Sequence, residues 1–174
     1  YFGLKVGANY CIRDLSERFV DRSGMGLHGG INISFDLQPH IAVYVAPQIK
    51  SSSYLTVYVP GENIYYTNLY LPALVWLRLL PRQSTSPYLG IGIAMNFQLH
   101  GKAVDAETGF KRPIEDLQND LYFTSCFGIE KKLARFRISP EISFNYNLTP
   151  DDLAPDIPVS IYDFSLAISA CYRL

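Results

Sequence analysis

Strict alternation of apolar and polar residues in segment 87–100, PYLGIGIAMNFQLH, most constrains how this 174-residue chain can fold. Every second residue from Leu89 to Leu99 is apolar, and the residues between them are small or polar. A period of two is that of a β-strand whose two faces differ chemically. The alternation lasts for about ten residues, which a tilted strand needs to cross a bilayer. The segment therefore predicts a transmembrane β-strand.

Seven other segments show the same alternation. We expect strands at about 2–13, 24–37, 41–50, 64–80, 87–100, 121–131, 136–148 and 160–174. The connections alternate long and short, beginning and ending with a long one, and the longest expected loop is 101–120. Outer-membrane barrels combine short periplasmic turns with long external loops. We therefore predict one domain, residues 1–174, that is all-β: an eight-stranded antiparallel up-and-down transmembrane β-barrel in a bacterial outer membrane, with periplasmic termini and extracellular long loops.

Charged residues avoid one face of each predicted strand. The other face carries Lys5, Asp36, Lys50, Arg78, Glu130, Arg137, Glu141, Asp163 and Arg173. A soluble barrel, such as a lipocalin-like carrier, needs charges outside, whereas a barrel in lipid needs them inside. Since eight strands enclose a lumen that side chains can fill, we expect inward charges to plug it. The expected interior polar network comprises Lys5, Arg78, Glu130, Arg137 and Glu141. A proton or ion pathway is the alternative use of these charges.

Composition excludes several other classes. A net charge of −1 and a pI near 6.3 argue against a nucleic-acid partner. The longest apolar run, 69–77, is too short for a helical span and contains Pro72, where we expect a bulge or a break in the strand ladder.

Strand-like sequence begins at the first residues, so we expect that a signal peptide has been removed. Cys11, Cys126 and Cys171 lack metal-ligand spacing and are expected to fill interior space, and no cofactor is expected.

Segment 68–79, NLYLPALVWLRL, resembles the PorT-like outer-membrane β-barrel family of Bacteroidetes-type bacteria. The family's G-x-K-x-G-x-N opening is similar to residues 3–9, its Leu-x-hydrophobic-Pro motif to 69–72, its Pro-Tyr-Leu start to 87–90 and its aromatic-Arg ending to 172–174. Tyr70 and Trp76 stand where members often carry Glu and Lys, and Leu174 stands where an aromatic residue is common. The resemblance covers the whole chain and implies a small cell-envelope barrel. Some relatives serve in protein secretion or gliding machinery.

Two sets of residues raise the question of chemistry. Small barrels that act on lipid A use an inward His near the outer rim, and both His28 and His100 fall on the inward phase near the long loops. Neither has a Ser and an acidic residue at a convincing spacing, so a structural role is favoured. Asp151, Asp152 and Asp156 lie among prolines, where a solvated loop is favoured over a calcium site.

Two classes of function follow. We expect a non-catalytic structural or adaptor barrel, surrounded by outer-membrane lipid with lipid A outward, that acts through a larger outer-membrane complex. The candidate partner surface comprises loop 101–120 and the hairpin expected beyond the third strand, which carries Tyr54, Leu55, Val57 and Tyr58. Exposed apolar side chains of this kind need a partner to cover them. The alternative is a lipid A hydrolase centred on His28 or His100.

Overall fold

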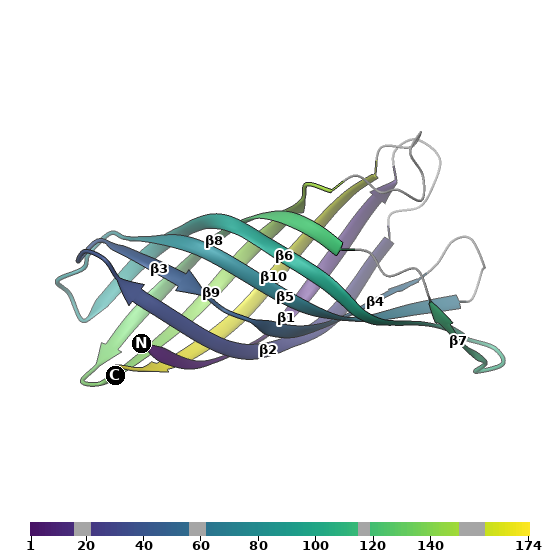
Figure 1. Cartoon of the computed structure of the whole chain (residues 1–174), viewed down its shortest axis with the longest axis horizontal. Helices are drawn as coiled ribbons and strands as arrows, with labels where there is room; N and C mark the ends of the chain where they lie inside the picture. The colour runs from purple at the N-terminus through teal and green to yellow at the C-terminus, as the bar shows by residue number, and fades with distance from the viewer. Residues whose placement is uncertain (16–21, 56–61, 115–118, 150–158) are drawn as a thin grey trace.

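A computed structural model describes residues 1–15, 22–55, 62–114, 119–149 and 159–174. These residues form one antiparallel sheet that closes on itself as an eight-stranded barrel (Figure 1). The wall is made of β1 (Phe2–Leu15), β2 (Arg22–Asp36), β3 (Ile41–Val45) continued by β4 (Gln48–Leu55), β5 (Glu62–Arg78), β6 (Thr85–Asp105), β8 (Asn119–Leu133), β9 (Phe136–Asn147) and β10 (Val159–Tyr172). Pairing of β1 with β10 closes the ring, so the wall has no free edge there.

Each strand of the wall pairs with the next one along the chain, which confirms the up-and-down topology. The short connections 37–40, 79–84 and 134–135 lie at the barrel end that also holds both termini (Figure 1). We call this the terminal end and the opposite one the loop end. The alternation of connection lengths in the sequence therefore predicted the course of the chain correctly.

Pro72 marks an interruption in the sheet, as expected, but the interruption is in the neighbouring strand. Strand β5 runs through Pro72 without a change of register against β6. On its other side, β3 ends at Val45 opposite Ala73, and β4 resumes at Gln48 opposite Tyr70. Between them, the Ala46 amide donates a hydrogen bond of 3.2 Å to the Pro72 carbonyl, and Pro47, which also lacks an amide donor, accepts one of 3.0 Å from the Ile31 amide. Two prolines, one on each of the neighbouring strands, thus interrupt the ladder where one wall strand is divided into β3 and β4.

The sheet continues beyond the barrel at the loop end. The expected loop 101–120 is not one loop, because β6 continues to Asp105 and the short strand β7 (Lys111–Ile114) pairs back onto it. Strand β4 continues to Leu55, paired with Asn63 of β5, as the hairpin expected there. We call the projecting part, residues 62–67 of β5, 99–105 of β6 and all of β7, the extension (Figure 1).

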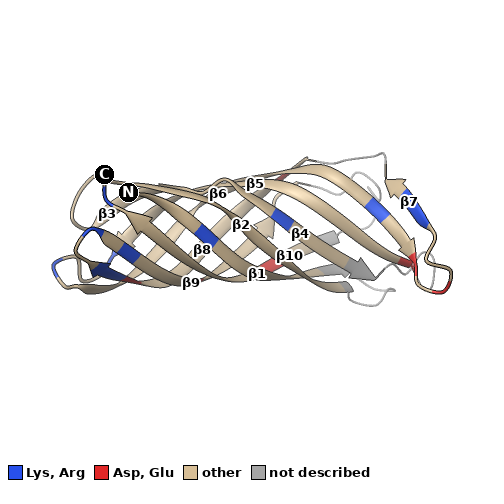
Figure 2. Cartoon of the chain, turned by 90° about the horizontal axis from the view of Figure 1, so that it is seen from below, with Lys and Arg blue, Asp and Glu red and all other residues tan. Residues whose placement is uncertain are grey.

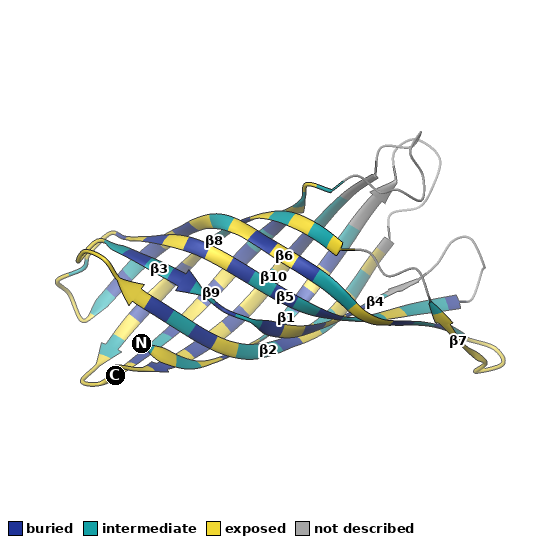
Figure 3. Ribbon diagram, in the orientation of Figure 1, coloured by how far each residue is buried: buried dark blue, intermediate teal, exposed yellow. Residues whose placement is uncertain are grey.

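Burial alternates along the wall strands, as the sequence predicted (Figure 3). The outward side chains are apolar and exposed, among them Leu4, Leu27, Ile91, Ile93 and Leu166. The inward side chains are polar or small and buried. A surface of this kind is stable in hydrocarbon and not in water. No helix within the described ranges is long and apolar enough to cross a membrane.

One bulge changes the phase of β6. The register between β5 and β6 shifts so that Asn68 faces Gln98 while Thr67 faces His100, which leaves Leu99 as an extra residue. An extra residue reverses the alternation beyond it. Gly101 and Ala103 therefore point to the buried side, and His100 is exposed on the outward side. The prediction that His100 faces the interior is wrong, because alternation was counted through the bulge.

Candidate functional site in the barrel interior

An ionic cluster fills the lumen nearest the terminal end. We call it the ionic layer, and its members are Asp36, Arg78, Glu130, Lys132 and Arg137. Asp36 bridges the two guanidinium groups, at 2.7 Å from Arg78 Nη2 and 2.5 Å from Arg137 Nη2. Glu130 lies 3.3 Å from Arg78 Nε and 3.2 Å from Arg137 Nη1, in ion-pair but not hydrogen-bond geometry. The strand ends bring these charges together and close the lumen.

Three stacked aromatic rings form the next layer. The Trp76 ring lies between those of Tyr44 and Tyr88, with centroid distances of 4.3 and 4.1 Å, and all three side chains are buried. Glycine makes room for the stack, since a Cβ added at Gly90 would lie 2.5 Å from Cys126 Sγ and 2.8 Å from the Trp76 ring. Sequence reasoning missed this aromatic layer. Its signal was three large rings on the inward phase, where the other residues are polar or small.

An isolated ion pair lies on the far side of the aromatic layer. Lys5 binds Glu141, both buried, and Tyr88 donates a hydrogen bond of 2.8 Å to the other carboxylate oxygen of Glu141. The Lys5 ammonium lies 5.4 Å from the Tyr44 ring centroid, within reach of a cation–π interaction. All five residues of the expected network are therefore inside the barrel. The structure divides them into two clusters, Lys5 with Glu141 and Arg78 with Glu130 and Arg137, with aromatic rings between.

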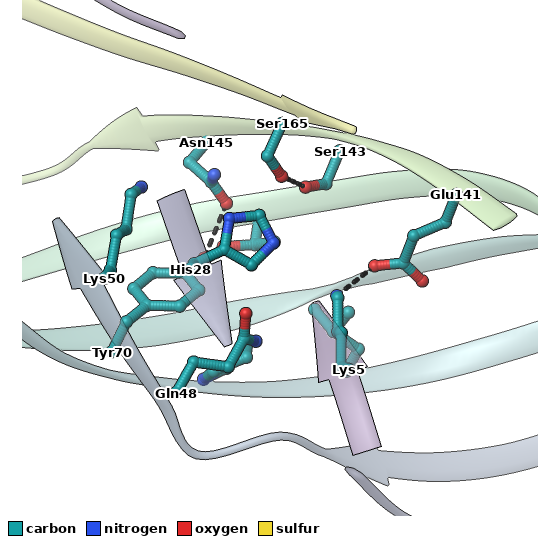
Figure 4. Close-up of a pocket in the computed structure, with 12 residues that line it drawn as sticks. Lys5, His28, Gln48, Lys50, Tyr70, Glu141, Ser143, Asn145 and Ser165 are labelled. Carbon is teal, nitrogen blue, oxygen red and sulfur yellow. Dashed lines mark hydrogen bonds and ion pairs between the residues drawn. The ribbon is translucent and has the colours of Figure 1, made fainter. Parts of the chain in front are cut away.

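A small cavity of about 20 Å³, lined mostly by polar residues, follows towards the loop end (Figure 4). Its lining includes Lys5, His28, Lys50, Tyr70, Glu141, Ser143, Asn145 and Ser165. Most of these groups already have partners. Lys50 pairs with Asp163 at 2.7 Å, Tyr70 donates to Asn145 at 2.6 Å, and the hydroxyls of Ser143 and Ser165 lie 2.5 Å apart. The side chains around the cavity are therefore largely paired: lysines with carboxylates, Tyr70 with an amide, and the two serines with each other.

His28 is the one histidine in this cavity. It is buried, its register partners are Gly7 and Lys50, and no hydrogen bond joins it to another described residue. A hydrolytic His needs a nucleophile within hydrogen-bond reach and a group that orients its ring. Ser143 and Ser165 contact one another instead, while Glu141 is bound by Lys5 and Tyr88. His100, the other expected candidate, lies outside the lumen.

The remaining expected site residues have separate locations. Cys11, Cys126 and Cys171 are buried in the interior. Tyr54 and Leu55 belong to the end of β4, whereas Val57, Tyr58, Asp151, Asp152 and Asp156 lie outside the described residues. Among the described residues, no group of three His, Cys, Asp or Glu side chains is placed to hold a metal ion.

The turn of the extension is held by one carboxylate. Asp105 accepts hydrogen bonds from the amide of Thr108 at 2.7 Å, from its hydroxyl at 2.9 Å and from the amide of Glu107 at 3.0 Å. These bonds, that of the Thr108 amide above all, lower the pKa of Asp105 below its ordinary value. Deeper in the extension, Arg112 Nη2 lies 3.1 Å from Glu62. Paired charges therefore tie β7 to its neighbours.

Comparison with known proteins shows similarity at the level of the fold. No family model matches the chain, and no curated protein matches it significantly. The solved structure of Neisserial surface protein A is similar with a TM-score of 0.56 and 11% identity, covering 99% of this chain and 97% of that one. The attachment invasion locus protein of Yersinia pestis has a TM-score of 0.51 and 12% identity, covering 97% and 96%. A major outer membrane protein from Thermus thermophilus has a TM-score of 0.53 and 13% identity, covering 98% and 99%. The chain thus shares the fold of small outer-membrane β-barrels.

Proposed function

We propose that the protein is a non-catalytic integral barrel of a bacterial outer membrane that acts as a structural or adaptor component of a larger complex. The extension is the observation that carries this proposal. A barrel that served only to occupy the membrane would not need strands that run beyond it. Termini in the periplasm, long loops outside and membership of the PorT-like type belong to the same proposal.

The filled lumen supports a role on the surface of the protein. The ionic layer and the aromatic layer lie one behind the other across the interior, and Arg78, Trp76 and Tyr88 in them are almost inaccessible. A solute that passed through would have to separate buried ion pairs and stacked rings. The cavity beside His28 lacks a hydrogen-bonded nucleophile and base among the described residues. These observations favour partner binding over conduction or hydrolysis.

The extension offers apolar side chains for such a partner. Phe110 at its turn is 70% exposed, within the segment expected to contact partners. Exposed aromatic residues on a projecting element are typical of protein contacts. Because β7 is paired with β6 and Asp105 holds the turn between them, this surface is formed before a partner arrives.

The test is extraction of native membranes in mild detergent, followed by native-size analysis and a comparison of boiled and unboiled gel samples. We expect migration with a much larger particle whose other subunits co-purify. Phe110→Ser should release the barrel from that particle. Leu80→Ser is the matched control, since Leu80 is an exposed apolar residue in a turn at the terminal end.

Migration of the wild-type protein as a lone barrel would refute the adaptor role. Lipid A hydrolysis by that lone barrel, lost in His28→Ala, would replace it with the enzymatic alternative. If the protein stayed in solution without detergent, the membrane assignment itself would be wrong.

A further inference from the structure

The two faces of the extension differ in charge. The register places Glu62 opposite Asp105, and Ala103 opposite Arg112, on the face that continues the barrel interior. The other face continues the lipid-facing surface, and its described residues are Asn63, Tyr65, Thr67, His100, Lys102, Val104, Lys111 and Pro113. None of these is acidic. The remaining described acid of this region, Glu107, lies in the turn. Along the described part of the extension, where Figure 2 marks basic positions in blue and acidic ones in red, the charged residues of the outward face are all basic and those of the inner face have both signs.

Basic and aromatic groups adjoin on this outward face. Lys102 is opposite Tyr65, and its ammonium lies 5.5 Å from the Tyr65 ring centroid. Lys111 and His100 are exposed on the same face, and Tyr65 is 40% exposed. None of the ion pairs found among the described residues involves Lys102 or Lys111. We call Tyr65, His100, Lys102 and Lys111 the basic patch.

The bulge at Leu99 determines that this patch faces outward. Without the extra residue, His100 and Lys102 would point to the inner side and Gly101 and Ala103 to the outer side. The phase reversal thus moves basic side chains onto the face that continues the lipid-facing surface of the barrel wall.

The patch lies at the height of lipid headgroups. The outward apolar residues of β6 run from Leu89 to Leu99, and ten steps of about 3.3 Å along a strand tilted by about 40° span roughly 25 Å. That span equals the apolar band of an outer-membrane barrel. His100 and Lys102 follow directly above it. Aromatic rings and lysines are favoured at this boundary, where an ammonium can reach anionic headgroups.

We propose that the basic patch binds the phosphate groups of the anionic glycolipid in the surrounding outer leaflet, a lipid A type headgroup. Lysine ammonium groups bind phosphate oxygens as mobile point charges, and the His100 ring can donate a hydrogen bond to the same group. A phosphate is favoured over a protein carboxylate because the patch adjoins the hydrocarbon band, where headgroups are always present. The inference rests on the proposed placement of the loop end outside the cell and not on the adaptor role, since it concerns the lipid-facing side of the extension.

The test uses the purified full chain in neutral detergent micelles, titrated with bisphosphorylated lipid A or with the same lipid after removal of both phosphates. We expect saturable binding of the phosphorylated lipid and at least tenfold weaker binding of the phosphate-free one. Lys102→Gln/Lys111→Gln should weaken binding of the phosphorylated lipid by roughly 30-fold, about fivefold for each lysine. Lys131→Gln/Arg135→Gln is the matched control, because it removes the same charge from exposed residues at the terminal end.

Three results would overturn the proposal: equal binding of the two lipids, unchanged binding by the Lys102/Lys111 variant, or equal loss in the control variant. Unboiled gels report whether each variant is a folded barrel. The comparison of the two lipids uses wild-type protein alone, so it shows whether the lipid phosphates are bound even if a variant fails to fold. Inorganic phosphate added in excess should not displace the lipid, since the acyl chains hold it beside the barrel. Failure of the native-size experiment would leave this outcome untouched.

Discussion

At the scale of single residues, Glu130 occupies the most demanding position in the lumen. Its side chain is fully buried and lies within 4 Å of three cationic groups, Arg78, Lys132 and Arg137. Asp36, the other acid of the layer, is about one third exposed. Removing one charged residue from a buried cluster leaves the oppositely charged residues without a partner that neutralises them.

We expect Glu130→Gln to lower the free energy of unfolding by roughly 3–5 kcal/mol, because two buried guanidinium groups then share one carboxylate. Urea titration in detergent, read as the fraction that migrates as a folded barrel on unboiled gels, measures this change. Glu107→Gln, at an exposed turn position, should stay within about 0.5 kcal/mol of the wild type. Equal stability of the Glu130 and Glu107 variants would show that the ionic layer contributes nothing.

The isolated pair of Lys5 and Glu141 allows a double-mutant cycle. Lys5→Met or Glu141→Leu alone should each destabilise the barrel by about 3 kcal/mol, since a single buried charge remains. The double variant should be more stable than either single one, because both charges leave together and apolar side chains replace them. The same urea titration measures all four proteins. Additive losses would mean that the two residues do not interact.

At the scale of elements, the bulge in β6 is the feature with the largest consequences. A single extra residue turns His100 outward and Ala103 inward, the reverse of what plain alternation predicts. It also separates the lipid-facing barrel wall from the basic face of the extension.

Cysteine labelling checks this phase reversal. We expect His100→Cys to react with a membrane-impermeant maleimide in folded detergent-solubilised protein, and Ala103→Cys, at a position only 1% exposed, to stay protected. The wild type is the background control, since its three cysteines are buried. The opposite labelling pattern would mean that β6 continues without a bulge.

At the scale of the whole molecule, the layers inside the barrel decide what it can transport. The ionic layer, the aromatic layer and the pair of Lys5 with Glu141 follow one another along the axis. Because the described side chains of these layers fill the interior, we expect no continuous water path of solute size through the barrel.

Recordings in planar bilayers should therefore show no stable conductance steps when the wild-type protein inserts. Glu130→Ala should show none either, since the aromatic layer remains closed behind it. A porin reconstituted in the same bilayer is the control for detection. Reproducible steps from the wild type would instead indicate the ion pathway that the inward charges left open as an alternative.

Alternation along the chain by itself determined the number of wall strands, their order and which side faces lipid. This worked because period two is a local property, and because hydrocarbon admits only apolar side chains outside a closed barrel. Every residue of the expected network, from Lys5 to Glu141, lies on the inner side for that reason.

Only the tertiary structure decided which inward residues meet. Depth in the lumen depends on the stagger of strands around the ring, so Arg78 pairs with Asp36 and Glu130, while Glu141 meets Lys5 beyond three stacked rings. The bulge at Leu99 cannot be detected in the sequence, because Leu99 continues the alternation of apolar and polar residues. The extra residue becomes visible only when β6 is paired with β5. Non-local pairing of strands therefore fixed the two clusters, the cavity and the outward direction of the basic patch.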